Sequence, residues 1–197
     1  MSTAQVNLGF LDSERDRIGA LYWEAFRQKL RPAFTDDAVG LRVIRAAMRS
    51  DRLLVARTDA GRVAGVCGFY AGGRGAADMT WGSLRDLLPF GQAVRAALVL
   101  SVLARSDQVG ALVLDGICVD VGGRRVGNGK ALLNAAELHA RNQGLASVQL
   151  SVIDSNPRAR ALYERRGFVP EHSGSLGLLG YVYGFDGYTV LRKKLTS

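Results

Sequence analysis

The sequence predicts an α+β domain with a mixed, mainly antiparallel sheet flanked by helices. Runs rich in β-branched residues recur along the chain as strand candidates, and amphipathic segments with helical periodicity lie between several of them. The resulting order is strand, helix, helix, strand, strand, helical stretch, strand, helix, strand, helix, strand. At 197 residues with 48 per cent apolar residues, the chain is long enough to bury the core of one domain.

The first half is predicted to supply two helices and a hairpin. Residues 6–11 alternate as a strand does. A helix follows, because apolar residues recur at intervals of three and four: Ile18, Leu21, Tyr22 and Phe26. A second helix is predicted at residues 36–48, with two acids at its N-terminal end. Residues 53–57 and 63–70 are predicted to pair as a hairpin, and residues 81–104 have a largely helical pattern.

The second half is organised around a glycine-rich turn between a strand and a helix. An apolar run at residues 111–119 leads into Arg124-Arg125-Val126-Gly127-Asn128-Gly129-Lys130, and an amphipathic helix is predicted from residue 130 to 142. Glycine lets the backbone turn sharply and approach a ligand closely. The first turn of a helix offers unpaired N–H groups and a positive dipole end. Residues 124–130, here called the anion loop, are therefore predicted to bind an anion, typically a phosphate.

Two common phosphate-binding motifs do not fit the anion loop. A Walker A loop needs a glycine where Arg124 stands and a Ser or Thr where Ala131 stands. A dinucleotide-binding fingerprint needs a third glycine three residues after Gly129, and Leu132 occupies that position. The pattern that fits is Arg-x-x-Gly-x-Gly, preceded by Val-Asp. A plain turn between strand and helix is the alternative interpretation.

A second motif follows a predicted strand at residues 148–153. The string Asn-x-x-Ala-x-x-Leu-Tyr-x-x-x-Gly-Phe runs from Asn156 to Phe168. Asn156 or Ser155 can cap a helix there, Pro157 suits its first turn, and a glycine ends it. The two motifs together, in this order and at this separation, resemble those of the GNAT-type N-acetyltransferase superfamily. The specific resemblance covers the second half of the chain.

The resemblance implies an acyl-CoA N-acyltransferase fold that uses acetyl-CoA (coenzyme A) as co-substrate, with no metal. It implies transfer of the acetyl group, by direct attack, to a primary amine of a small molecule or a protein. Residues 75–109 then form a helical insertion in the single domain 1–197, with three alternative roles: lining the acceptor pocket, contacting a second subunit of a homodimer, or packing against the sheet. By the same resemblance, twelve residues bind the co-substrate: Ile117, Cys118, Val119, Arg124, Arg125, Val126, Gly127, Asn128, Gly129, Lys130, Asn156 and Tyr163.

Two side chains are implied to be catalytic. Tyr163 matches a tyrosine that gives a proton to the departing thiolate; packing against the core is the alternative. Asp115 lies in an apolar strand, where an unpaired carboxylate is costly, so it acts as the base or forms a structural salt bridge. A backbone N–H at or near Cys118 or Val119 is implied to stabilise the oxyanion. Ribosomal-type N-terminal acetyltransferases carry a glutamate where this chain has Ser151, which argues against a peptide N-terminus as acceptor.

The remaining composition bears on partners and compartment. The net charge of +8 suits coenzyme A and equally suits nucleic acid, but no helix-turn-helix or aromatic-basic strand is apparent, so no nucleic-acid partner is expected. Two cysteines in apolar runs are expected to be buried free thiols, and two histidines give no credible metal site. No membrane partner and a cytoplasmic location are expected. A catalytically weak CoA-binding module and transfer of another acyl group remain alternatives.

Overall fold

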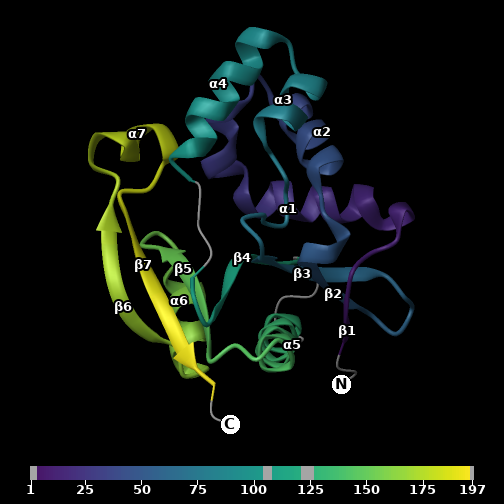
Figure 1. Ribbon diagram of the computed structural model, residues 1–197, viewed down its shortest axis with the longest axis vertical. Helices are drawn as coiled ribbons and strands as arrows, with labels where there is room; N and C mark the ends of the chain where they lie inside the picture. The colour runs from purple at the N-terminus through teal and green to yellow at the C-terminus, as the bar shows by residue number, and fades with distance from the viewer. Residues whose placement is uncertain (1–3, 104–107, 121–126, 196–197) are drawn as a thin grey trace.

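The computed structural model describes residues 4–103, 108–120 and 127–195, in which a seven-stranded sheet lies between two layers of helices (Figure 1). The strands are β1 Gln5–Leu8, β2 Leu53–Arg57, β3 Val63–Tyr70, β4 Ala111–Val119, β5 Ser147–Ile153, β6 Val169–Ser175 and β7 Gly187–Lys194. The helices are α1 Arg15–Leu30, α2 Asp37–Ala47, α3 Trp81–Leu87, α4 Phe90–Ser101, α5 Asn128–Asn142, α6 Pro157–Arg165 and α7 Gly180–Tyr183.

The sheet has the order β1-β2-β3-β4-β5-β7-β6. Among the strands that the structure describes, β4 and β5 are the one parallel pair, and the other neighbouring strands run antiparallel. The predicted α+β fold with a mixed, mainly antiparallel sheet is therefore confirmed. None of the described helices has both the length and the apolar character needed to cross a bilayer.

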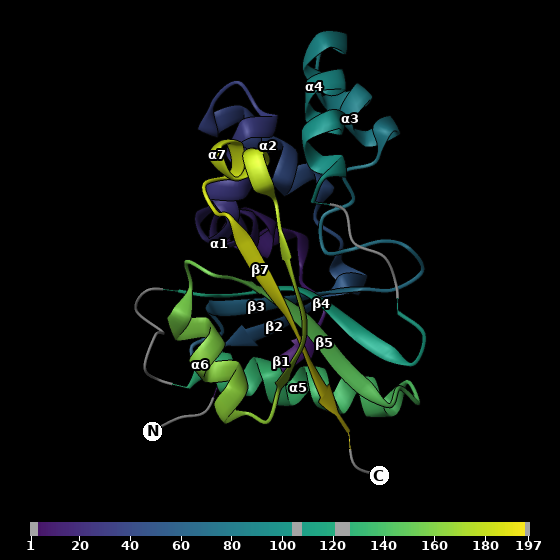
Figure 2. The same ribbon diagram turned by 90° about the vertical axis from the view of Figure 1, so that its left-hand side faces the viewer.

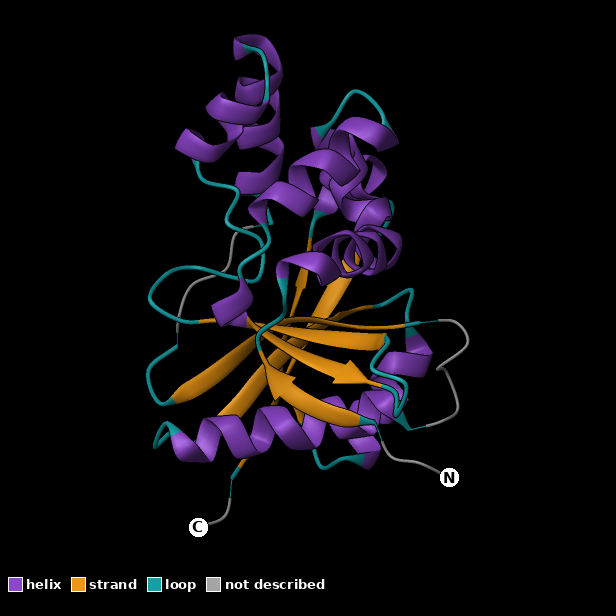
Figure 3. Cartoon of the chain, turned by 90° about the vertical axis from the view of Figure 1, so that its right-hand side faces the viewer, coloured by secondary structure: helices purple, strands orange, loops and turns teal. Residues whose placement is uncertain are grey.

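Alternation along the strands gives the sheet two apolar faces. In β2, Leu53 and Val55 belong to a core with α1 to α4, whereas Leu54 and Ala56 belong to a second core with α5. This follows from the two-residue period of a strand, which points successive side chains to opposite faces. Figure 3 shows the resulting layers, with α5 along one face and the remaining long helices on the other.

The parallel pair β4–β5 is short. Three residue pairs join the two strands, from Ala111 and Ser147 to Val113 and Gln149. Beyond these pairs β4 continues its ladder with β3, while β5 continues with β7. In Figure 2, β5 and β7 run across the direction of β3 and β4. The two halves of the sheet therefore diverge after Val113.

The C-terminal segment differs from the prediction in two places. The predicted order has one strand after the last helix, whereas the structure has two, because residues 169–175 form the edge strand β6, which pairs with β7. The aromatic and β-branched residues Tyr181 to Tyr183 favour a strand, but they belong to the short helix α7. Gly184, with φ +72°, ends that helix before β7 begins.

Candidate functional site

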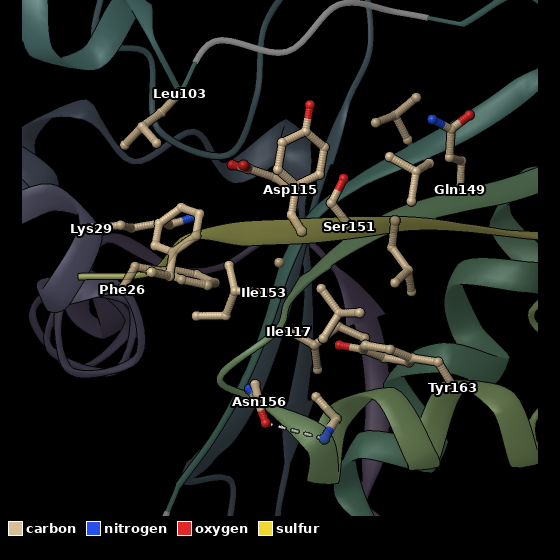
Figure 4. Close-up of a pocket in the computed structure, with 18 of the residues that line it drawn as sticks. Phe26, Lys29, Leu103, Asp115, Ile117, Gln149, Ser151, Ile153, Asn156 and Tyr163 are labelled. Carbon is tan, nitrogen blue, oxygen red and sulfur yellow. Dashed lines mark hydrogen bonds between the residues drawn. The ribbon is translucent and has the colours of Figure 1, made fainter. Parts of the chain in front are cut away.

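A pocket of about 500 Å³ lies where β4 and β5 separate. It is lined by residues of α1, β4, β5, α6, β6 and β7, by Val102 and Leu103 at the end of α4, and by Gln108 just before β4. Residues of the predicted insertion therefore line this pocket. Figure 4 shows Asp115 and Ile117 of β4, Ser151 of β5 and Tyr163 of α6 around it.

A β-bulge in β4 places Asp115 in this pocket. Gly68 of β3 pairs with Gly116 and Phe69 pairs with Leu114, so Asp115 is the extra residue. Leu114 faces the α5 side of the sheet, whereas Cys118 packs in the core on the α1 side. Between them, Asp115 contacts Tyr22 of α1, and a side chain at Gly116 would meet the Cζ end of the Phe26 ring.

The Asp115 carboxylate is held by neutral donors. The Tyr22 hydroxyl donates to Oδ2 at 2.8 Å, and the backbone N–H of Ala76 donates to the same oxygen at 3.3 Å. The ion pairs of the described residues do not include Asp115, so the salt-bridge interpretation has no partner there. Burial first, and then the Asp115 carboxylate, raise the pKa of Tyr22 well above its usual value. Tyr22 is therefore a protonated donor at neutral pH.

The backbone of β4 alternates between β3 and the pocket side. The N–H of Asp120 bonds to Ala64 of β3 at 2.9 Å, and a side chain at Gly65 would meet the Cys118 carbonyl oxygen. In a strand the N–H and C=O of one residue point to one side, and those of the next residue point to the other. The N–H and C=O of Ile117 and Val119 therefore face away from β3. Of the predicted strand-pairing residues, these two present backbone groups to the gap beside β5, and Cys118 does not.

The start of α5 lies within the anion loop. The helix begins at Asn128, two residues earlier than predicted. Gly127 caps it with φ +91°, a left-handed conformation that favours glycine, and its carbonyl accepts from the N–H of Ala131 at 3.0 Å. Asn128 is buried, and Lys130 is exposed. Arg124, Arg125 and Val126 lie outside the described residues.

Helix α6 brings Asn156 and Tyr163 to the pocket. The Asn156 Oδ1 accepts from the N–H of Ala159 at 3.1 Å, so Asn156 caps the helix, as one of the two predicted caps (Figure 4). Tyr163 lies two turns later, half-buried, with its ring 6.0 Å from that of Phe168. Its hydroxyl points into the pocket (Figure 4).

Comparison with known proteins identifies the family. A family model described as "Acetyltransferase (GNAT) family" matches residues 15–168. The chain belongs to this family. No curated protein sequence matches the chain. The protein is therefore an acyltransferase, and its family transfers acyl groups from acyl-CoA to amines.

Solved structures of GNAT acetyltransferases share the fold. An N-acetyltransferase from Staphylococcus aureus Mu50 is 18% identical, with 96% of this chain and 100% of that chain covered and a TM-score of 0.69. Ard1 from Thermoplasma volcanium is 17% identical over 100% of both chains, with a TM-score of 0.62. The ribosomal-protein-S18-alanine N-acetyltransferase from Escherichia coli is 15% identical, covering 98% and 94%, with a TM-score of 0.56.

Both cysteines of this GNAT protein are buried free thiols, as predicted. Burial raises the pKa of Cys67 to about 12 and raises the pKa of Cys118 further. A thiol with so high a pKa is protonated at neutral pH and is a poor nucleophile. Among the described residues, no group of three or more His, Cys, Asp or Glu side chains is placed to hold a metal ion.

Sequence reasoning missed several residues of the site. Tyr22 and Phe26 were assigned only to the apolar face of α1, yet Tyr22 bonds Asp115 and Phe26 lines the pocket. Tyr188 of β7 also lines it and does not stand in the two recognised motifs. Tyr22 could have been predicted as a partner of Asp115 only if the packing of α1 against β4 had been known.

Proposed function

We propose that this GNAT protein is an N-acetyltransferase that moves the acetyl group of acetyl-CoA directly to a primary amine of a small molecule or a protein. The observation that carries the proposal is the pocket between β4 and β5, which has Asp115 on its α1 side and Tyr163 on its α6 side. A transfer to an amine needs a proton acceptor and a proton donor, and these residues supply one of each.

The residues around the gap fit acetyl-CoA. A pantetheine arm carries amide groups, and the backbone groups of Ile117 and Val119 face the gap where β5 no longer pairs. The left-handed Gly127 and the N-terminal turn of α5, with Asn128, Gly129 and Lys130, suit a pyrophosphate. Arg124, Arg125 and Val126 are proposed to bind the pyrophosphate as well, because they belong to the same motif of the sequence. Asn156 keeps its side-chain amide N–H groups for a ligand, since only its Oδ1 caps α6.

Acetyl-CoA supplies an activated acyl thioester. Asp115 accepts a proton from the ammonium form of the acceptor, which frees the nitrogen lone pair for attack on the acyl carbon. The backbone N–H of Val119 stabilises the oxygen as it becomes negative. The C–S bond then breaks, and the Tyr163 hydroxyl gives its proton to the leaving thiolate. The attacking nitrogen loses its second proton as the amide forms, and this proton restores the Tyr163 hydroxyl. A direct attack is favoured over an acyl-enzyme because the thiols of Cys67 and Cys118 stay protonated.

The experiment is a thiol-release assay with acetyl-CoA and a panel of amines, including small amines and peptides, with mass spectrometry of the product. Amine-dependent release and an N-acetylated product are expected. Propionyl-CoA and succinyl-CoA in the same assay decide the acyl preference. Thiol release that does not depend on the amine, or none with any acceptor, would refute acetyl transfer to an amine.

A further inference from the structure

We propose that Tyr22 is a positioning residue for this reaction: with the N–H of Ala76 it fixes one oxygen of Asp115, so that the other oxygen meets the acceptor amine. The inference rests on the proposed function, because it assigns Asp115 a role in proton transfer. It adds a residue of α1 and a backbone group of the segment before α3, and neither belongs to the two recognised motifs.

Both donors reach the same carboxylate oxygen. The Tyr22 hydroxyl lies 2.8 Å from Oδ2, and the Ala76 nitrogen lies 3.3 Å from it. No donor to Oδ1 is found among the residues that the structure describes, while Asp115 lines the pocket. Rotation of the carboxylate would break both hydrogen bonds at once. The pair of donors therefore holds Oδ1 toward the pocket, where an acceptor ammonium would lie.

The position of the Ala76 amide is itself determined by its surroundings. A side chain at Gly68 would come within 2.6 Å of the Ala76 Cβ, and one at Gly75 would come within 3.2 Å of the Asp115 Oδ2. These two glycines allow the segment to lie against the bulge. The segment is also tied to the end of α2, because the Ala76 carbonyl accepts from Arg49 at 2.9 Å and the Asp78 N–H donates to Ala47 at 2.8 Å.

Tyr22 is suited to donate rather than to titrate. It is 4% exposed, and burial keeps the pKa of its phenol far above neutral pH. Its ring packs edge-on against Phe26 at 4.6 Å between centroids. Replacing it by phenylalanine keeps this ring packing and removes only the hydroxyl, so the two contributions of Tyr22 are separable.

The test compares Tyr22→Phe with the unchanged enzyme on two acceptors, an alkylamine that is protonated at the assay pH and a weakly basic aromatic amine that is not. The kcat/KM for the alkylamine should fall about tenfold or more, as for loss of a hydrogen bond to a charged group. The aromatic amine needs no base to release its lone pair, so its kcat/KM should change by roughly twofold at most. The dissociation constant of acetyl-CoA should not change.

Tyr183→Phe is the matched control. Tyr183 is 2% exposed, its hydroxyl donates to the Val99 carbonyl at 2.6 Å, and it does not line the pocket. This variant should keep the kinetics of the unchanged enzyme with both amines. Melting temperatures of both variants, measured together, show how much each buried hydroxyl contributes to stability.

Asp115→Asn and the double variant separate the two hypotheses. If Tyr22 acts through Asp115, adding Tyr22→Phe to Asp115→Asn should cause no further loss. If Asp115→Asn slows the alkylamine reaction and Tyr22→Phe does not, the positioning role is wrong and the proposed function stands. If Tyr22→Phe lowers kcat/KM equally for both amines, the positioning role is also wrong, because an equal loss indicates a general structural effect. If Asp115→Asn has no effect, the base role and the positioning role both fail.

Discussion

Asp115 and Gly116 are consecutive residues of β4, and both face α1. Asp115 accepts a hydrogen bond from Tyr22, and Gly116 faces the Cζ end of the Phe26 ring. In a regular strand two neighbours face opposite sides, so the bulge at Asp115 produces this arrangement. It brings a carboxylate to the pocket and leaves no room for a side chain at the next position.

Gly116→Ala tests this packing. The added methyl group would overlap the Phe26 ring, and such overpacking costs about 1–3 kcal/mol of unfolding free energy. In a protein that already carries Phe26→Ala, the same Gly116→Ala change should cost less unfolding free energy, because the overlapping ring is gone. Denaturant unfolding gives both values. Gly82→Ala, in α3 with open space around it, is the control and should not destabilise the protein. Equal stability of Gly116→Ala and the parent would contradict the packing described.

Tyr163→Phe tests the proton donor. Turnover with an alkylamine acceptor should fall on the order of a hundredfold, since a general acid contributes at least this much. The affinity for acetyl-CoA, measured by titration, should be unchanged because the ring remains in place. Unchanged turnover, with the chemical step shown to limit the rate, would leave Tyr163 as a core-packing residue beside Phe168.

Gly127→Val tests the anion loop. Valine is strained at φ +91°, and the displaced backbone should lower the affinity for acetyl-CoA by about tenfold or more. Gly144→Val is the control, since Gly144 has φ +69° and follows the opposite end of α5. Both variants should lose comparable stability, and only Gly127→Val should lose affinity. An equal loss of affinity in both would show that strain, and not the site, is responsible.

Glu14 and Arg57 make stability depend on pH. Hydrogen bonds from Arg57 lower the pKa of Glu14 below its ordinary value of 4.5. The pair therefore stabilises the fold above pH 4.5, and this contribution disappears as the pH falls through the lowered pKa. Glu14→Gln should lower the unfolding free energy by about 1 kcal/mol at pH 7, with a smaller difference in acid.

Glu164→Gln is the control for this pair. Glu164 meets Arg160 on an exposed face of α6, where both side chains are 44% exposed, so its removal should change stability by roughly 0.5 kcal/mol or less. Thermal melts of the parent and both variants between pH 3 and pH 7 provide the comparison. A Glu14→Gln difference that stays constant over this range would contradict the assignment.

The second half of the fold was predictable because its signals are local. The apolar run of β4, the cap Asn156 and the terminating Gly167 each mark an element within a few residues. β6 was missed because it is an edge strand whose residues are mostly exposed and polar and include Pro170, so it lacks the alternation of a half-buried strand. The aromatic and β-branched residues 181–183 have strand propensity, but the glycines on either side allow a helical turn.

The site was predictable only where a residue looked unusual in its own segment. Asp115 was recognised because an acid is costly in an apolar strand. Its partner Tyr22 is 93 positions away and has the spacing of an ordinary core residue on α1, so nothing local distinguishes it. The bulge depends on the register between β3 and β4, which the sequence of either strand alone does not determine.

The central claim is that the gap between β4 and β5, with the start of α5, binds acetyl-CoA. Calorimetric titration of the purified protein with acetyl-CoA tests it most directly, with ATP and NAD as controls. Saturable binding of acetyl-CoA, without comparable binding of ATP or NAD, is the predicted result. No binding of acetyl-CoA by protein shown to be folded would contradict the account.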